Sequence, residues 1–280
     1  MRKLLSANFA RLWKSKIFWT LEGFCFGFGV FTYILVAINT RNLGQGWLEY
    51  EAHAYFYFPF LFIAAIIAIF ACFFIGNDYS DGTIRNKLIV GHSRMNIYFS
   101  FFLIVCIASV LFLLAHVLAV LIVGLPFSGA AVLTHVELQP WRIMNFLLTA
   151  IAYAAIFTLL SMLDSNKARN VVVSLLSAGV LIFAGIYFYG KVSAPEYIQL
   201  VTPQSDGSLL LQDGPPNPEY LTGTTRMVYH WITLILPSGS VMLSLDKSLG
   251  FDWQNSVCSI VMIFLLTVAG IFFFKQKDIK

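Results

Sequence analysis

Residues 54–75 read AYFYFPFLFIAAIIAIFACFFI, a run without a single charged side chain. An α-helix needs about 20 predominantly apolar residues to cross the hydrocarbon core of a bilayer, so this run is long enough for one span. Within lipid every backbone N–H and C=O group must find a partner, and a helix satisfies these groups inside its own segment. The run therefore predicts a transmembrane helix.

Runs of the same kind recur along the rest of the 280-residue chain. Together they predict spans at residues 17–38, 54–75, 97–124, 142–163, 170–190 and 255–274. None of these runs shows the alternation of apolar and polar side chains that is typical of an outer-membrane barrel. The predicted fold class is an all-α integral membrane protein with six transmembrane helices, in a single transmembrane domain over residues 1–280.

The composition supports this class, because 59% of the residues are hydrophobic and only 11% are charged. The net charge of +4 does not indicate a nucleic-acid partner, since the basic residues flank the apolar runs instead of forming a stripe. The cysteines lie far apart inside apolar runs, so we expect small buried side chains and neither disulfides nor a metal site.

The N-terminal segment, residues 1–16, predicts an amphipathic helix that lies along the membrane surface and contacts lipid. Its apolar face combines Leu5, Phe9, Leu12 and Trp13. The basic residues of the same segment are available to lipid headgroups. We expect the segment to be retained, because it lacks the small-residue cleavage site of a signal peptide.

The distribution of basic residues predicts the orientation. Six spans place both chain ends on one side of the membrane, and that side holds thirteen of the eighteen basic residues: Arg2, Lys3, Arg11, Lys14, Lys16, Arg85, Lys87, Arg94, Lys167, Arg169, Lys275, Lys277 and Lys280. Because Lys and Arg are enriched in cytoplasmic loops, both termini are predicted to be cytoplasmic.

Residues 191–254 form the longest hydrophilic stretch and are predicted to be extracellular. Within it, an apolar segment at about residues 230–245 is interrupted by Pro237, Ser238 and Gly239. Each arm is too short to span a bilayer, so we expect a re-entrant or interfacial hairpin before the last span.

A search for catalytic motifs predicts no enzyme activity and no cofactor. The nearest match to a phosphate-binding loop, residues 185–192, lacks the hydroxyl residue that would bind magnesium and lies at the end of an apolar run. Zinc-protease and nucleophile-elbow motifs are absent from the sequence.

The predicted cytoplasmic loop between the second and third spans, residues 76–94, reads GNDYSDGTIRNKLIVGHSR. Ser80 or Asp81 is suited to cap a short helix that begins near Gly82, and Gly91 is suited to end it after about two turns. Such a helix would present Arg85 and Lys87 at the membrane surface. On these residues alone, we favour the interpretation as an ordinary basic inner loop.

This loop resembles the segment after the second span in permease subunits of the ABC transporter type-2 family. That family shows an acidic residue, a Gly-Thr pair, a basic residue and a Ser-Arg ending, which Gly82, Thr83, Arg85, Ser93 and Arg94 match. Gly91 stands where a proline is common in the family, and no lysine soon follows Arg94. The expected topology, with its N-terminal amphipathic helix and a hairpin before the last span, is also similar.

The resemblance implies that the loop forms a coupling helix that docks on a separate ATPase subunit. The residues that it would place in ATPase coupling are Asp78, Asp81, Gly82, Thr83, Arg85, Lys87, Ser93 and Arg94. It further implies an ABC exporter of the bacterial cell membrane with two ATPase subunits, which bind ATP and magnesium, and with a second permease subunit as a homodimer or heterodimer partner.

The cargo implied by the resemblance is amphipathic, such as an antimicrobial peptide, a lipid or a hydrophobic drug. Other functions stay open. An ion-coupled secondary transporter would need several buried ionisable residues and paired broken helices. A membrane-embedded enzyme would need a polar catalytic cluster, and a non-transporting assembly or sensor protein is compatible with the sequence.

Four residues are predicted to belong to a cargo path or a dimer seam: Glu22, Gly23, Gly27 and His116. Glu22 either faces a cavity or lies at the membrane interface, where it would pair with Lys14 or Lys16. Glycines permit close approach of helices, which suits a seam between subunits. His116 is either a functional group or a hydrogen-bonded histidine of the core.

Overall fold

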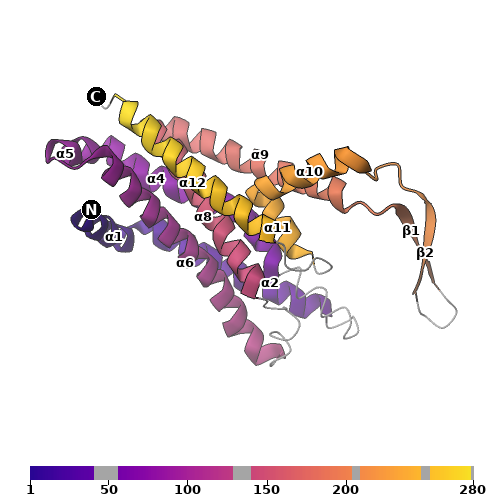
Figure 1. The fold of residues 1–280 in the computed structure, drawn as a ribbon. Coiled ribbons are helices and arrows are strands. Elements are labelled where there is room, and N and C mark those ends of the chain that lie inside the picture. Colours follow the sequence, from indigo (N-terminus) through magenta and orange to yellow (C-terminus); the bar gives the residue numbers. More distant parts are fainter. Residues whose placement is uncertain (41–55, 129–139, 204–208, 247–252, 279–280) are drawn as a thin grey trace.

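The computed structural model describes residues 1–40, 56–128, 140–203, 209–246 and 253–278 (Figure 1). In this part of the chain, six segments are long and apolar enough to cross a membrane. They contain the helices α2 (Lys16–Thr40), α4 (Ile63–Ser80), α6 (Arg94–Ser128), α8 (Pro140–Leu163), α9 (Lys167–Ser193) and α12 (Trp253–Gln276). A short 3-10 helix, η1 (Phe58–Phe62), precedes α4. The prediction of an α-helical membrane protein with six spans is confirmed.

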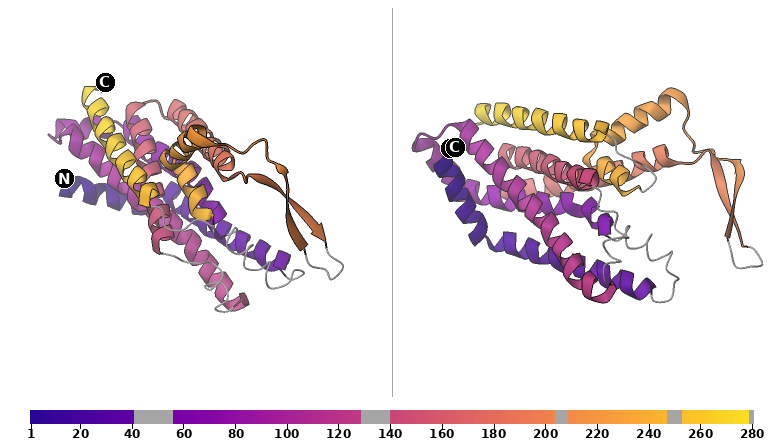
Figure 2. Two further views of the ribbon diagram at one scale, coloured as in Figure 1. Left: turned by 45° about the vertical axis from the view of Figure 1, so that its right-hand side comes forward. Right: turned by 60° about the horizontal axis from the view of Figure 1, so that its bottom comes forward.

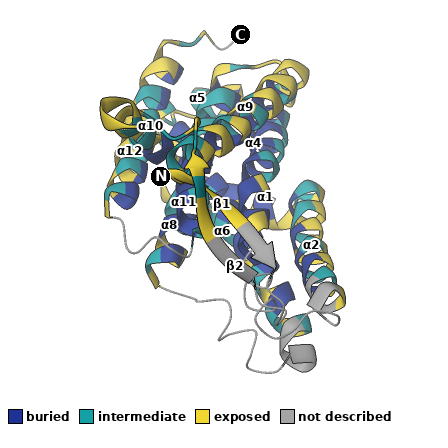
Figure 3. Cartoon of the chain, turned by 90° about the vertical axis from the view of Figure 1, so that its right-hand side faces the viewer, coloured by how far each residue is buried: buried dark blue, intermediate teal, exposed yellow. Residues whose placement is uncertain are grey.

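The core of the bundle is built around α4, which packs against α6, α8 and α9. Ala64, Ala68 and Ala71 recur on one face of α4 and are fully buried, which lets the neighbouring helices approach closely. The spans α4, α6 and α8 are 61–67% buried, whereas α2, α9 and α12 are only 17–28% buried. The outer faces of these three peripheral helices are therefore available to lipid or to another subunit (Figure 3).

Both termini lie at one end of the bundle, together with the short helix α5 (Thr83–Ile89) (Figure 1). We call this the inner end, following the predicted orientation. The N-terminal helix α1 (Arg2–Lys14) is separated from α2 by an extended residue, Ser15, and packs against α6. Leu4, Asn8 and Leu12 are buried against the bundle, while Phe9 and Trp13 are exposed. The position of α1 along the membrane surface stays a prediction.

At the opposite end, α10 (Gly223–Ile235) and α11 (Pro237–Leu245) meet at an angle of 103°. Proline suits the first position of α11, because the N–H that it lacks would have no helical partner there. A Cβ atom at Gly239 would lie 2.2 Å from the Thr233 carbonyl oxygen, so only glycine permits this close approach. The predicted break at Pro237–Gly239 thus falls at the first turn of α11, and its membrane position stays a prediction.

Between α9 and α10 the chain forms two antiparallel strands, β1 (Tyr197–Pro203) and β2 (Leu209–Pro216). They project from the end of the bundle opposite α5 (Figure 2). The sequence analysis predicted no strands in this Pro- and Gly-rich stretch. The cross-strand pair Gln199 and Asp213, whose side chains form a hydrogen bond of 2.7 Å, joins positions that sequence alone does not align.

Candidate functional site

The turn from α4 into α5 is made by Gly82, which has a left-handed backbone with φ of +66°. The prediction that Ser80 or Asp81 caps α5 is wrong, because no side chain caps this helix. The reason is that α4 continues to Ser80, whose hydroxyl donates to the Gly76 carbonyl 3.0 Å away. Thr83 instead secures the turn, since its hydroxyl donates to the Asp78 carbonyl at 3.1 Å.

The end of α5 follows the prediction. Gly91 is left-handed, with φ of +93°, and its N–H donates to the Leu88 carbonyl at 2.9 Å. The N–H of His92 donates to the Lys87 carbonyl at 3.1 Å. These two hydrogen bonds form a Schellman motif, which ends the helix after seven residues and returns the chain toward α6.

Helix α5 has two contrasting faces. Ile84 is fully buried, and Lys87 and Leu88 are half-buried against the bundle. Arg85 and Asn86 are exposed, and so are Ile89 and Val90, at 72% and 77% of their surface. One face therefore anchors the helix, while the other presents an apolar pair next to a cation.

The anchored face is held by Asp78, a buried carboxylate in the last turn of α4. It forms an ion pair with Arg11 of α1 and a second with the Lys87 ammonium, 2.6 Å away. Lys87 also donates to the Asn8 side-chain oxygen at 3.2 Å, and Arg11 to the Phe74 carbonyl at 2.9 Å. One carboxylate thus connects α1, α4 and α5.

Two aromatic rings complete this cluster. The Arg11 guanidinium lies 3.8 Å from the centre of the Phe74 ring, and the Lys87 ammonium lies 4.5 Å from that of Phe101. Burial lowers the pKa of Arg11 to about 10, an effect that the carboxylate of Asp81 opposes. Burial and, to a lesser degree, the positive charge of Arg11 lower the pKa of Lys87 to about 8. Both cations keep their charge near pH 7, and Lys87 loses it first as the pH rises.

The residues on either side of Asp78 contact other helices. The Asn77 side-chain oxygen accepts from Lys167 of α9 at 2.7 Å, and the Tyr79 hydroxyl donates to the Met162 carbonyl of α8 at 2.6 Å. Consecutive residues of a helix point about 100° apart, so three neighbours at the end of α4 reach three sides of the bundle. The last turn of α4 therefore contacts α1, α8 and α9.

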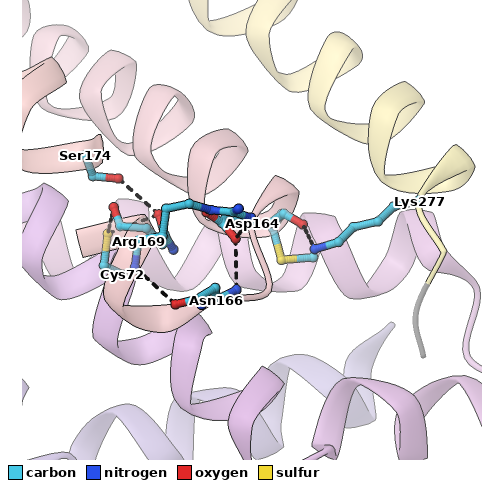
Figure 4. A network of polar contacts seen from close by, with 8 residues as sticks. Cys72, Asp164, Asn166, Arg169, Ser174 and Lys277 are labelled. Atoms are coloured by element: carbon cyan, nitrogen blue, oxygen red, sulfur yellow. Dashed lines mark hydrogen bonds and ion pairs between the residues drawn. The ribbon is translucent and has the colours of Figure 1, made fainter. Parts of the chain in front are cut away.

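The C-terminal segment joins the same region. Lys277 donates to the Met162 carbonyl at 2.9 Å, and its ammonium lies 4.0 Å from the centre of the Tyr79 ring. Figure 4 shows Lys277 reaching toward the connection between α8 and α9, where Asp164 and Arg169 form an ion pair of 2.6 Å. Burial lowers the pKa of Lys277 to about 8, whereas hydrogen bonding to Arg169 holds the pKa of Asp164 below its usual range.

Arg94, the first residue of α6, links the start of this helix to the end of α12. Its guanidinium donates to the carbonyls of Phe274 and Lys275, at 3.0 and 3.2 Å, and to that of Lys277. It thus satisfies carbonyl groups that the end of α12 leaves unpaired. Arg94 is half-buried, and its guanidinium faces the end of α12.

The structure places the eight predicted coupling residues together at the inner end of the bundle, but their side chains differ in burial. Asp78, Lys87 and Arg94 face the bundle, Gly82 and Thr83 form the turn, and Asp81, Arg85 and Ser93 are exposed. Sequence analysis missed several residues of the cluster: Asn8, Arg11, Tyr79, Lys277, Ile89 and Val90. The spacing of Leu4, Asn8 and Leu12 is a signal for Asn8, because a polar residue on an apolar face requires a polar partner.

The second predicted set lies elsewhere, along α2 and α6. The imidazole of His116 is buried and lies 3.1 Å from the Phe56 carbonyl oxygen, as the core-histidine interpretation requires. Among the described residues Glu22 pairs with neither Lys14 nor Lys16, and its Oε2 atom has no hydrogen-bond partner. Gly23 and Gly27 face away from their own bundle, since a Cβ atom at either would meet nothing within 4 Å.

These features describe a polytopic membrane protein whose inner helix ends converge on one short helix exposed at the surface. The family model described as "ABC-2 family transporter protein" matches residues 4–185, which run from α1 through most of α9. The match covers more than half of the chain, and the chain belongs to the ABC-2 transporter family. A comparison with curated proteins finds no match. The family assigns the chain to the transmembrane, generally non-catalytic part of an ABC transporter and implies an ABC ATPase subunit as partner.

Proposed function

We propose that this chain is the permease subunit of an ABC exporter and that its ATPase subunit docks on the exposed face of α5. The observation that carries the proposal is the pair Ile89 and Val90, which are 72% and 77% exposed at the tip of the bundle. Burying apolar surface contributes roughly 25 cal/mol per Å², so a partner that covers this pair gains affinity.

The polar side chains on the same face fit such an interface. Arg85 precedes Ile89 by one helical turn, and Asn86 precedes Val90 by the same spacing. Arginine is enriched at protein interfaces, where apolar contacts occupy the centre and polar contacts the rim. Ile89 and Val90 would form the centre of the contact, and Arg85 would supply hydrogen bonds at its edge.

The anchored face of α5 would transmit the movement. When the ATPase subunits bind and hydrolyse ATP with magnesium, their rearrangement would push on α5. Asp78 and Lys87 would carry this displacement to α1 and α4, and Arg94 would carry it to α12. The reoriented spans would then open a path out of the cell.

The walls available to a cargo favour an apolar or amphipathic molecule. A cavity of about 240 Å³ between η1, α6 and α8 is lined by Phe56, Tyr57, Phe60, Leu113 and Phe146, among others. Sites with such linings select apolar ligands. The described residues give less support to an ion-coupled transporter, because the paired charges around Asp78 lie at the inner end of the bundle and not near its middle.

A second permease subunit would pack against α2. Gly23 and Gly27 are one turn apart and open outward, which is the spacing that lets two transmembrane helices approach closely. The half-buried carboxylate of Glu22 adjoins this pair and would gain a polar partner from the second subunit.

The docking proposal is tested by substituting Ile89 with Asp in the tagged full-length chain. We expect the ATPase subunit that copurifies with the wild-type chain, identified by mass spectrometry, to be reduced at least about tenfold, which corresponds to about 1.4 kcal/mol. Ile198→Asp is the matched control, since Ile198 is an exposed isoleucine on β1 at the far end. Equal recovery of the ATPase with both variants would contradict the docking site.

A further inference from the structure

A cavity of about 550 Å³ opens at the end of the bundle opposite α5, between the last turns of α9, the first turns of α10 and the end of α11. Its lining includes Tyr189, Arg226, Met227, His230, Leu243 and Asp246. Charged, aromatic and apolar side chains therefore meet in one opening, next to the point where α9 leaves its apolar span.

Arg226 is held at the wall of this cavity. Its Nη2 atom donates to the Val192 carbonyl at 3.1 Å, and its guanidinium lies 4.7 Å from the centre of the Tyr220 ring. A guanidinium carries five N–H donors, and one hydrogen bond to the protein leaves most of them for a ligand. The side chain is only half-buried, so a ligand can reach it from the opening.

The charged side chains of the cavity lining are Arg226 and Asp246. The Tyr189 hydroxyl donates to the Asp246 carboxylate at 3.0 Å, and the buried Arg142 donates to the Asp246 backbone carbonyl at 3.3 Å. The Asp246 carboxylate therefore already has a hydrogen-bond donor from the protein. The nearby ion pair between Lys191 and Glu219, at 3.0 Å, adds no net charge. The remaining donors of Arg226 therefore favour an anionic ligand, because guanidinium groups match the geometry of phosphate oxygens.

An apolar stripe on α10 begins at the same cavity. Met227 lines the opening and is 62% exposed, and Trp231 and Ile235 follow at intervals of one turn with 45% and 55% exposed. Residues at this spacing share one face of a helix, so the stripe extends for about 12 Å, at 1.5 Å per residue. A cationic cavity that continues into an apolar stripe is suited to an amphiphile rather than to a free ion.

We propose that this cavity binds the phosphate of an anionic phospholipid from the outer leaflet, with Arg226 donating to the phosphate and the acyl chain lying along Met227, Trp231 and Ile235. Such a lipid would hold α10 against α9 and α11. The proposal is independent of the ATPase docking proposed above.

The test is lipid binding to the purified full-length chain, measured by native mass spectrometry with phosphatidylglycerol and with phosphatidylcholine. We expect preferential binding of phosphatidylglycerol and at least about tenfold weaker binding in Arg226→Gln, which corresponds to about 1.4 kcal/mol. Lys191→Gln is the matched control, because it removes a cation at the same end whose partner is Glu219. Met227→Glu is a second variant. Because Met227 is exposed, we expect this variant to fold, and its carboxylate should repel the phosphate.

Three results would overturn the proposal. The first is undiminished phosphatidylglycerol binding in both Arg226→Gln and Met227→Glu. The second is equal binding of the two lipids, which would remove the argument from charge. The third is displacement of phosphatidylglycerol by an equal concentration of inorganic phosphate, which would identify a free-anion site instead of a lipid site.

Discussion

Charged contacts at the inner end of the bundle can be compared with glycine contacts at the outer end. At the inner end, Asp78 joins α4 to α1 and Arg94 joins α6 to α12, helices that are far apart in the sequence. At the outer end, Gly185 and Gly239 allow backbones to touch, since a Cβ atom at either would come within 2.2 Å of a neighbouring oxygen. Ion pairs and hydrogen bonds can shift among partners, whereas close steric packing cannot. The charged contacts around Asp78 are therefore suited to receive a displacement, and the glycine contacts between α9, α10 and α11 to keep these helices in place.

This comparison predicts that charge matters most at the inner end, and Asp78→Asn is its strongest test. The substitution leaves two half-buried cations without their carboxylate. Breaking a buried ion pair typically costs about 3–5 kcal/mol, so we expect a decrease of this order in the free energy of unfolding, measured in detergent. We also expect α1 to become accessible to protease.

The matched control for that experiment is Asp81→Asn. Asp81 is exposed and three residues further along the chain. We expect no measurable change in the free energy of unfolding. If the two variants lost equal stability, Asp78 would not be the residue that connects α1, α4 and α5.

At the outer end we expect side-chain size to have the largest effect on stability, and Gly239→Ala is the test. The added methyl group would lie 2.2 Å from the Thr233 carbonyl oxygen, and overpacking of this kind costs about 1–3 kcal/mol. Gly179→Ala is the control, because nothing lies within 4 Å of the added atom. In a helix interior that change is expected to stabilise by about 0.5–1 kcal/mol. Thermal unfolding of both variants in detergent separates the two effects, and similar melting temperatures would remove the steric argument.

The smallest expected effect is a pH dependence of coupling. Because the pKa of Lys87 is about 8, its ammonium is about half deprotonated at pH 8 and loses its attraction to Asp78 as the pH rises further. Permease-stimulated ATPase activity should therefore fall by about half around that pH, relative to the activity of the ATPase alone. Lys87→Arg keeps its charge and should abolish the fall. The same decline in both proteins would assign it to another group.

The division between spans and loops could be predicted from the sequence because it depends on composition alone. A run such as residues 54–75 has no other stable place than lipid or a protein core. The left-handed Gly91 could also be predicted, since its role is local. In both cases the determining residues are neighbours in the chain.

The features that could not be predicted from the sequence depend on contacts between residues that are distant in the chain. Arg11 fits a lipid headgroup as well as a buried carboxylate, and only the packing of α1 on α6 decides between them. Arg94 matched a family pattern, but its partners are the last carbonyls of α12, 180 and more positions away. The pairing of β1 with β2 and the two faces of α5 likewise require the folded chain.

The most direct test of the docking surface is site-specific photocrosslinking in cells that express both subunits. A photoreactive residue at Val90, which is 77% exposed, should crosslink to the ATPase, whereas the same residue at Leu88, on the half-buried face, should not. Position 198 on β1 should also give no such product. Crosslinking of the ATPase from position 198 and not from position 90 would contradict the account.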